Sequence, residues 1–420
     1  MYNLFNKTKE KEKKMKSDSK MIVNAVIIVM AVLLIVLAFI VYVSFTQKKN
    51  ENNSDSTNNA TNLNETTNVI DNEESETEYS DEIEVVPTMK DELIGDTVWC
   101  PTFQLVWNDM KNEVVKQDIE FIADDEPEYL ENLNAESFTE NNLSDEYYYK
   151  KWGIKSNDLK NEIIDGIKEK FNETSDVIDE KEDWDEWQNA AVDEEKRYIF
   201  YAMLKKVFNF ENPFDELEDG YFNSGDGTYY NNVKYFGIND ESDENLKDQV
   251  TILYYSDFDN LAISIKTKEN DEVILAKGVE GKTFAKMYEN IQKSSDEYTG
   301  ETVMGDDDIL RIPNLQFNVL KDYEDLENKS FFNADGNRCF IAKALQTVRF
   351  EMDNEGGKIK SEAIIEMVKA TSLIEDVEFK NLNFDSDFVL FIKEADKDLP
   401  YFALNVSDIS KFQEDVSIEE

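Results

Sequence analysis

Histidine, cysteine and the carboxylates carry most protein chemistry, and this chain uses them unevenly. It has no histidine, two cysteines and 92 Asp and Glu residues. Without histidine it lacks the usual general base of serine and cysteine hydrolases and the commonest zinc ligand. Carboxylate pairs are too numerous here to argue for or against a glycosidase-like mechanism. We therefore expect a protein that is not an enzyme, with no catalytic residues, no metal and no cofactor.

The acidic excess also limits the partners. The formal net charge of −48 makes nucleic acid a very poor ligand, because phosphate binding depends on Lys and Arg. Calcium loops need acidic ligands at alternating positions before a glycine, and the stretches around Gly227 and Gly336 fail this pattern. We interpret the charge as a solvated surface.

The two cysteines, Cys100 and Cys339, are far apart in the sequence. Two thiols do not make a disulfide framework, although a disulfide would persist outside the cytoplasm. The sequence leaves both a Cys100–Cys339 disulfide and two free thiols open.

An apolar segment near the N-terminus predicts a membrane anchor. Residues 21–45 are interrupted only by Asn24 and Ser44, and about 20 apolar residues suffice for a helix to cross the hydrocarbon core. Seven lysines precede the segment and two follow it closely, so the positive-inside bias places residues 1–20 in the cytoplasm. We expect an uncleaved signal anchor in the cell membrane, with the rest of the chain extracellular.

Beyond the anchor, composition divides the chain further. Residues 46–92 are dominated by Asn, Ser, Thr, Asp and Glu, which predicts a disordered spacer. We expect one extracytoplasmic domain at 93–412 and an acidic tail at 413–420. The Asn, Lys and Glu bias suggests a bacterial cell surface.

Apolar periodicity predicts an α+β domain with a helical N-terminal part. Helices are expected over Phe103–Val115 and from Leu159 to Phe171, where apolar residues recur on one face. The segment from 118 to 150 reads as irregular. Strands are expected where aromatic and β-branched residues gather, at Tyr198–Phe210, Thr251–Tyr255, Leu261–Ile265, Val273–Leu275 and Ile309–Phe317.

Several collinear segments resemble the serpin family. The passage Ile341–Gly356 is similar, without gaps, to the central strand that leads through an acidic pair and a glycine into the reactive-loop hinge. Asn383–Ile392 and Leu399–Val406 resemble the two closing strands of that family. Earlier, Tyr198–Asp215 resembles a strand ending in Pro-Phe, and Ile309–Phe317 with Tyr323–Phe331 resembles a strand and a short helix. The likeness fades between 118 and 190, where several helices of the family are expected.

The resemblance implies large mixed β-sheets and an exposed reactive-type loop that is cut by a serine protease and then inserts into a sheet. The implied hinge residues are Glu355, Gly356, Gly357, Ile359, Ser361 and Ala363. Because side chains alternate along a strand, Gly357, Ile359, Ser361 and Ala363 would face inward, while Lys358, Lys360, Glu362 and Ile364 face outward. This alternation permits insertion in one register only.

The family's spacing places the scissile region near Lys369, Ala370 and Thr371. Lys369 would select a trypsin-like protease, and Ala370 an elastase- or subtilisin-like one. Ile359 with its flanking lysines departs from the small residues of inhibitory hinges, and residues 364–370 could instead form a short helix. Two functions therefore stay open: a membrane-tethered inhibitor of extracytoplasmic serine proteases, or a non-inhibitory binding or structural module with the same fold.

Overall fold

The computed structural model describes residues 79–80, 82–122, 126–175, 178, 198–327, 329–359 and 380–418. The chain divides into two compact units, Met1–Ser75 and Glu76–Glu420, and all described residues belong to the second. The predicted anchor at 21–45 and the tail at 1–20 lie outside the described residues. Within the described part of the chain, no helix combines the length and apolar character needed to cross a membrane.

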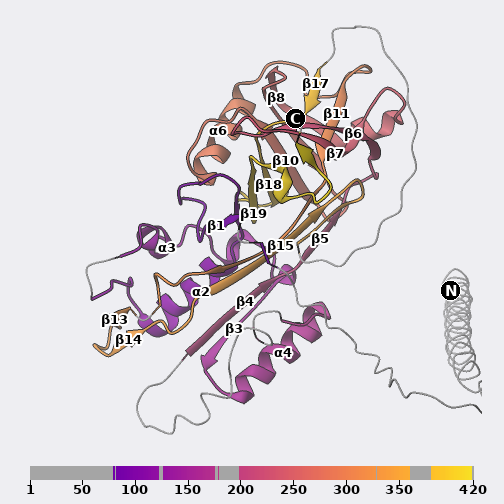
Figure 1. The fold of residues 1–420 in the computed structure, drawn as a ribbon. Coiled ribbons are helices and arrows are strands. Elements are labelled where there is room, and N and C mark those ends of the chain that lie inside the picture. The colour runs from indigo at the N-terminus through magenta and orange to yellow at the C-terminus, as the bar shows by residue number, and fades with distance from the viewer. Residues whose placement is uncertain are drawn as a thin grey trace, which may run out of the picture. The chain divides into compact units, whose positions relative to one another are not determined.

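The centre of the domain is a seven-stranded sheet with both faces covered (Figure 1). All five residues from Phe388 to Ile392 are buried, as expected for a strand that is covered on both sides. In spatial order the strands are β1 (Glu84–Val85), β2 (Thr97–Trp99), β19 (Phe402–Val406), β18 (Phe388–Glu394), β10 (Asp271–Lys277), β9 (Asn260–Lys266) and β8 (Val250–Asp257).

A second sheet holds β17 (Asn381–Asn383), β11 (Ile309–Pro313), β7 (Tyr229–Ile238) and β20 (Ser417–Ile418), with β6 (Asp215–Asn223) also paired to β7. Gly237 in β7 has a φ of 152°, and a Cβ there would lie 1.9 Å from the carbonyl oxygen of Leu310. Only glycine permits this close approach of β7 to β11.

A third sheet has the order β12 (Leu315–Asp322), β15 (Leu345–Met352), β16 (Gly356–Ile359) and β5 (Lys206–Asn209). The described residues also form two two-stranded antiparallel sheets. One pairs β3 (Tyr148–Ile154) with β4 (Tyr198–Leu204), and the other is a hairpin of β13 (Ser330–Phe332) and β14 (Arg338–Phe340).

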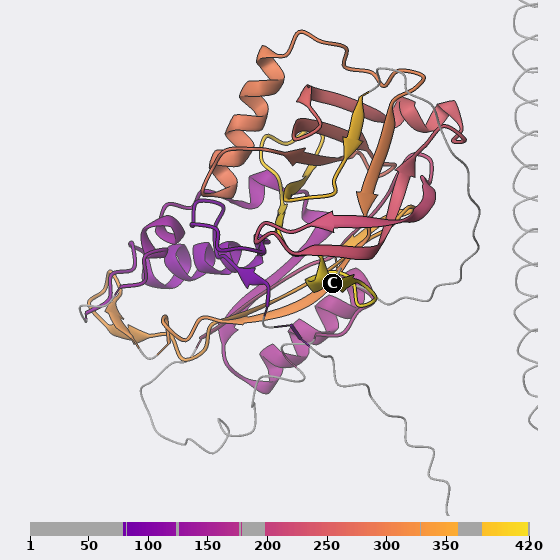
Figure 2. The same ribbon diagram turned by 45° about the horizontal axis from the view of Figure 1, so that its top comes forward.

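In the part of the chain that the structure describes, four α-helices pack around the sheets (Figure 2). They are α2 (Thr102–Asp109), continued by a π-helical segment at Met110–Val115, α3 (Leu130–Asn134), α4 (Asn157–Phe171) and α6 (Phe284–Glu297). α4 begins at Ser156, whose side chain accepts a hydrogen bond from the Leu159 amide, and ends at Asn172 in the left-handed conformation. Its buried face packs on the β3–β4 pair, apart from the main core.

The two predicted helices and the strands at 251–255, 261–265 and 273–275 are confirmed. The predicted strand at Ile309–Phe317 is wrong as one element, because Asn314 marks the point where the chain passes from β11 to β12 in another sheet. The predicted short helix at Tyr323–Phe331 is also wrong. There the Tyr323 side chain is buried, its hydroxyl donates to Gln346, and the chain makes a turn at Leu326.

Folded structure starts earlier than the predicted boundary at residue 93. β1 pairs in parallel with β2, and Val85, Val86 and Met89 are buried in the main core. A short apolar run among acidic residues is too weak a signal to separate a strand from a spacer. At the other end, part of the predicted acidic tail is tied down, because β20 pairs with β7 and Gln413 hydrogen bonds with Lys234.

Candidate functional site

The described part of the hinge predicted from sequence includes β16 (Gly356–Ile359), a strand of the third sheet. β16 lies between β15 and β5, with Phe350 and Lys206 on either side of Ile359, and Met352 and Phe208 on either side of Gly357. It is therefore paired on both sides, as an interior strand.

Two glycines allow β16 to enter the sheet. Gly356 has a φ of 149°, and a Cβ there would lie 2.2 Å from the Phe208 carbonyl oxygen. A Cβ on Gly357 would lie 2.4 Å from the Phe208 ring. The preceding residue, Glu355, accepts a hydrogen bond from the Phe210 amide through its carbonyl oxygen. Larger side chains at 356 and 357 would push β16 away from β5.

The side chains of β16 alternate between the two faces of the sheet. Ile359 is 3% exposed and belongs to the main core. Lys358 points the other way, is half-buried, and lies 3.9 Å from Glu351. A bulky Ile359 is thus accommodated beneath this sheet.

Beyond Ile359, β15 continues on one side and β4, which precedes β5 in the chain, lies on the other, with a cavity between them. Among the described residues, the Leu345–Arg349 part of β15 has β12 as its strand partner, and β4 has β3. Residues 344–349 and 198–204 line opposite sides of a cavity of about 1280 Å³, with Ile359 at its end and α2 along it. We call this cavity the strand slot, and we call the divergence of β4 from β15 at Lys206 and Ile359 the fork.

Both cysteines line the strand slot and both are free thiols. Burial raises the pKa of the Cys100 thiol to about 12, so it is protonated at neutral pH. Cys339, in β14, is partly exposed.

A buried cluster of charges lies behind the fork. The Nζ atom of Lys206 is 3.1 Å from Asp271 Oδ1, 3.9 Å from Glu394 Oε1 and 3.1 Å from the centre of the Tyr147 ring. The side chains of Lys206 and Asp271 are 0% exposed and that of Glu394 is 7% exposed. Burial raises the pKa of Asp271 to about 6, against the opposing effect of the Lys206 charge.

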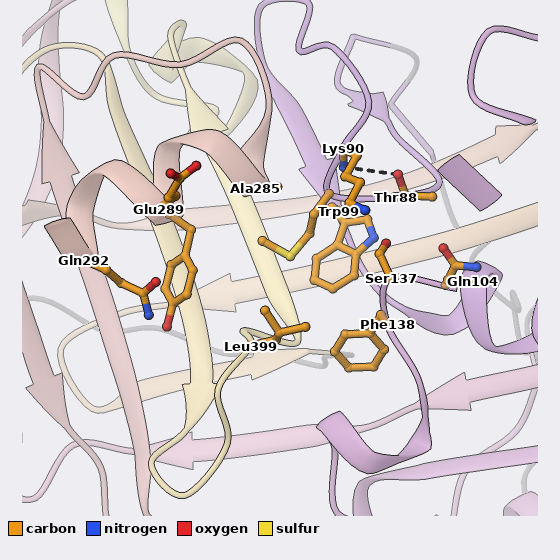
Figure 3. A pocket seen from close by; sticks show the side chains of 12 residues that line it. Thr88, Lys90, Trp99, Gln104, Ser137, Phe138, Ala285, Glu289, Gln292 and Leu399 are labelled. Atoms are coloured by element: carbon orange, nitrogen blue, oxygen red, sulfur yellow. Dashed lines mark hydrogen bonds between the residues drawn. The ribbon is translucent and has the colours of Figure 1, made fainter. Parts of the chain in front are cut away.

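A smaller cavity, of about 220 Å³, lies between α2 and α6. Figure 3 shows Trp99 and Phe138 on one side of it and Glu289 and Gln292 of α6 on the other. The rings of Trp99 and Phe138 pack edge to face, with their centroids 5.4 Å apart. The Trp99 Nε1 and Gln104 Oε1 atoms are buried and have no hydrogen-bond partner among the described residues. Both atoms are shielded from the cavity as well as from solvent, so the accessible wall is mainly apolar.

The structure brings part of the predicted site together. Glu355, Gly356, Gly357 and Ile359 form or precede β16. Ser361, Ala363 and the scissile candidates Lys369, Ala370 and Thr371 lie outside the described residues.

Sequence reasoning missed Lys206, Asp271 and Glu394, although one signal was present. In a strand with alternating faces, the adjacent residues Lys205 and Lys206 cannot both point to solvent.

No family model matches the chain, and no curated protein is significantly similar to it. Serpins of known structure are similar. Serpin48, a highly specific serpin of the insect Tenebrio molitor, shares 13% identity, with 75% of this chain and 92% of that chain covered and a TM-score of 0.42. Thyroxine-binding globulin in complex with thyroxine shares 12% identity, with 62% and 76% covered and a TM-score of 0.36. At such low identity the likeness concerns the fold alone and says nothing of what this chain does.

Proposed function

We propose that this chain is a membrane-tethered, serpin-like inhibitor of extracytoplasmic serine proteases. The observation that carries the proposal is the position of β16, whose last residue, Ile359, stands at the end of the strand slot. A chain that continues from Ile359 in the same direction would enter the slot as a further strand.

The register of such a strand follows from the existing ladder. Ile359 lies opposite Phe350 and Lys206, so Ser361 would lie between Val348 and Leu204. Val348 and Leu204 are both buried in the main core. Small inward residues, Ser361 and Ala363, suit this packed side, and the charged Lys360 and Glu362 would fall on the outer side.

Insertion would be favourable for two physical reasons. It would add backbone hydrogen bonds on both sides of the new strand, each contributing ~1 kcal/mol net. It would also fill the cavity along α2 with side chains, which restores packing contacts. Cleavage of the loop is what would free enough chain to complete the strand. We place that cleavage near Lys369, Ala370 and Thr371, which makes trypsin-like and subtilisin-like proteases the probes of choice.

The test is to incubate the full chain, in detergent, with trypsin and with a subtilisin and to run a reducing denaturing gel. A band at the sum of the two masses supports covalent inhibition. The matched variant Gly357→Arg should lose this band, because its side chain would collide with Phe208 and Glu351. Loop cleavage that leaves the protease fully active and forms no covalent band would rule the inhibitor out.

The tether is part of the proposal and rests on the apolar run at 21–45 and its lysine asymmetry. The chain should stay with the membrane fraction after alkaline carbonate extraction. Deletion of residues 21–45 should release it into the soluble fraction. Release of the intact chain by carbonate would argue against a spanning anchor.

The second candidate function is a non-inhibitory binding module, and the cavity between α2 and α6 favours it. An apolar cavity of ~150 Å³ can take up benzene, so about 220 Å³ has room for a ligand of one or two rings. The ligand would be held mainly by contacts with apolar and aromatic side chains such as Trp99, Phe138 and Leu399. Titration with indole and with an anilinonaphthalene dye, read by Trp fluorescence, tests this. The control is Ala285→Trp, which fills the cavity; if it binds the probes as the natural chain does, they bind elsewhere.

A further inference from the structure

A buried cluster of charges, Lys206, Asp271 and Glu394, lies where the fork begins. We call this cluster the charged joint. Lys206 lies directly opposite Ile359, and β16 is described no further than this pair. The Lys206 side chain leaves the third sheet and reaches the end of the seven-stranded sheet, where Asp271 of β10 and Glu394 of β18 lie opposite each other. Two carboxylates facing each other across a ladder repel, so a shared cation between them stabilises the pair.

The segment just before β3 also contacts this charged joint. The Lys206 ammonium stacks on the Tyr147 ring, and the Lys205 amide donates to the Tyr147 carbonyl oxygen at 2.9 Å. The Ser144 amide donates to Glu394 Oε2 at 2.8 Å. One wall of the strand slot, β4, therefore connects to the seven-stranded sheet through this cluster.

Titratable or charged side chains from four other segments interact electrostatically with Asp271, whose amide also donates to the Thr267 hydroxyl just after β9. They are Lys206 of β5, Glu394 of β18, Tyr401 before β19 and Tyr147 before β3. The positive charge of Lys206 lowers the pKa of Asp271, and the negative charge of Glu394 raises it. With both carboxylates ionised, the buried site holds one cation and two anions.

We propose that Lys206 is a positioning residue for strand insertion, that its contacts with Asp271 and Glu394 hold the vertex of the fork, and that protonation of Asp271 sets how readily the fork opens. The proposal deepens the proposed function and rests on it for the meaning of opening, but the joint is measurable in the uncut chain. Opening moves Tyr147 and Lys206 away and exposes Asp271 to water.

The direction of the pH effect follows from linkage. A carboxyl whose pKa is about 6 when buried and near 3.8 when exposed releases its proton on opening, so opening becomes easier as pH rises from about 4 to 6. The opening equilibrium should rise on the order of a hundredfold over this range and level off above it. Low pH therefore stabilises the closed fork, and neutral pH makes its opening easier.

Hydrogen exchange of the full, uncut chain in detergent tests the joint between pH 4 and 8, corrected for the intrinsic exchange rate. The reporters are amides of 345–349 and 198–204, which line the slot. In the natural protein the opening equilibrium should reach half of its high-pH plateau value near pH 6, the midpoint, and Asp271→Asn should show no such rise. Glu394→Gln should move the midpoint to lower pH, because the Glu394 charge raises the pKa of Asp271. Lys206→Met should move the midpoint to higher pH, because the Lys206 charge lowers that pKa.

Asp385→Asn is the matched control, since Asp385 pairs with Lys277 at 2.8 Å at the other end of β10. It should leave the midpoint unchanged. An unchanged profile in Asp271→Asn, or equal midpoints in the Lys206 and Glu394 variants, would overturn the proposal. If hydrogen exchange depends on pH as expected but no covalent protease complex forms, the inhibitor proposal is refuted and the proposal for the charged joint stands. If the chain forms the complex but its exchange does not depend on pH, the proposal for the joint is refuted and the inhibitor proposal stands.

Discussion

Ile359 lies directly opposite Lys206 in the ladder between β16 and β5, and both side chains point into the interior of the protein. Ile359 is apolar and suits a buried position. Lys206 is a buried cation and needs the carboxylates of Asp271 and Glu394. The last hinge residue that the structure describes, Ile359, and the charged joint are therefore neighbours in the same row of the sheet. Movement at the hinge and the electrostatics of the joint should influence each other.

Gly356→Ala should destabilise the domain more than an ordinary glycine replacement does. A positive φ alone makes alanine unfavourable by ~1 kcal/mol. At Gly356 the new Cβ would also overlap the Phe208 carbonyl oxygen, which should add ~1–3 kcal/mol. Urea unfolding measures the difference. The control is Gly336→Ala, which has a φ of 80° and no atom within 4 Å of its Cβ; equal losses in the two variants would mean that β16 does not depend on this close approach.

Ile359→Ala should lower the free energy of unfolding by ~2–4 kcal/mol, because a buried side chain leaves a cavity when truncated. Lys358→Ala, one residue earlier and on the outer side, should change it by less than ~1 kcal/mol. Paired urea titrations of the two variants give the comparison. If Ile359→Ala lowers the free energy of unfolding no more than Lys358→Ala does, Ile359 lies outside the packed core in solution.

Asp271 should make stability depend on pH in an unusual direction. Its folded pKa, about 6, lies above the value of the unfolded chain, so the folded state binds the extra proton. Its stabilising contribution is complete below about pH 4 and is lost as pH rises through 6, by up to ~3 kcal/mol. Because other carboxylates titrate too, the quantity to measure is the difference in unfolding free energy between the natural chain and Asp271→Asn. A difference that stays constant from pH 4 to 7 would contradict it.

The two thiols should differ in reactivity. Cys100 is buried with a raised pKa, and Cys339 is partly exposed in β14, so a thiol reagent at pH 8 should modify Cys339 first. Unfolding in denaturant without reductant should expose both. Cys339→Ser should abolish the fast phase and Cys100→Ser should keep it. A denatured, unreduced chain with no reactive thiol would show that the cysteines are bonded.

Local patterns in the sequence predicted much of the secondary structure. The helices at Phe103–Val115 and Leu159–Phe171 were found because their apolar residues recur on one face, which is a local property. α3, α6 and β3 were missed. In α6 only Phe284, Tyr288 and Ile291 are buried, too few to set a helix apart in a polar segment.

The one register in which the hinge suits a sheet can be predicted from neighbouring residues alone, since side chains alternate between the faces of a strand. The position of that strand and its contacts depend on how distant segments pack together. The strand slot depends on the distance between β4 and β15, which are separated by well over a hundred residues. The joint depends likewise on bringing Lys206 to Asp271 and Glu394, because charge pairing in a core is set by which surfaces pack together.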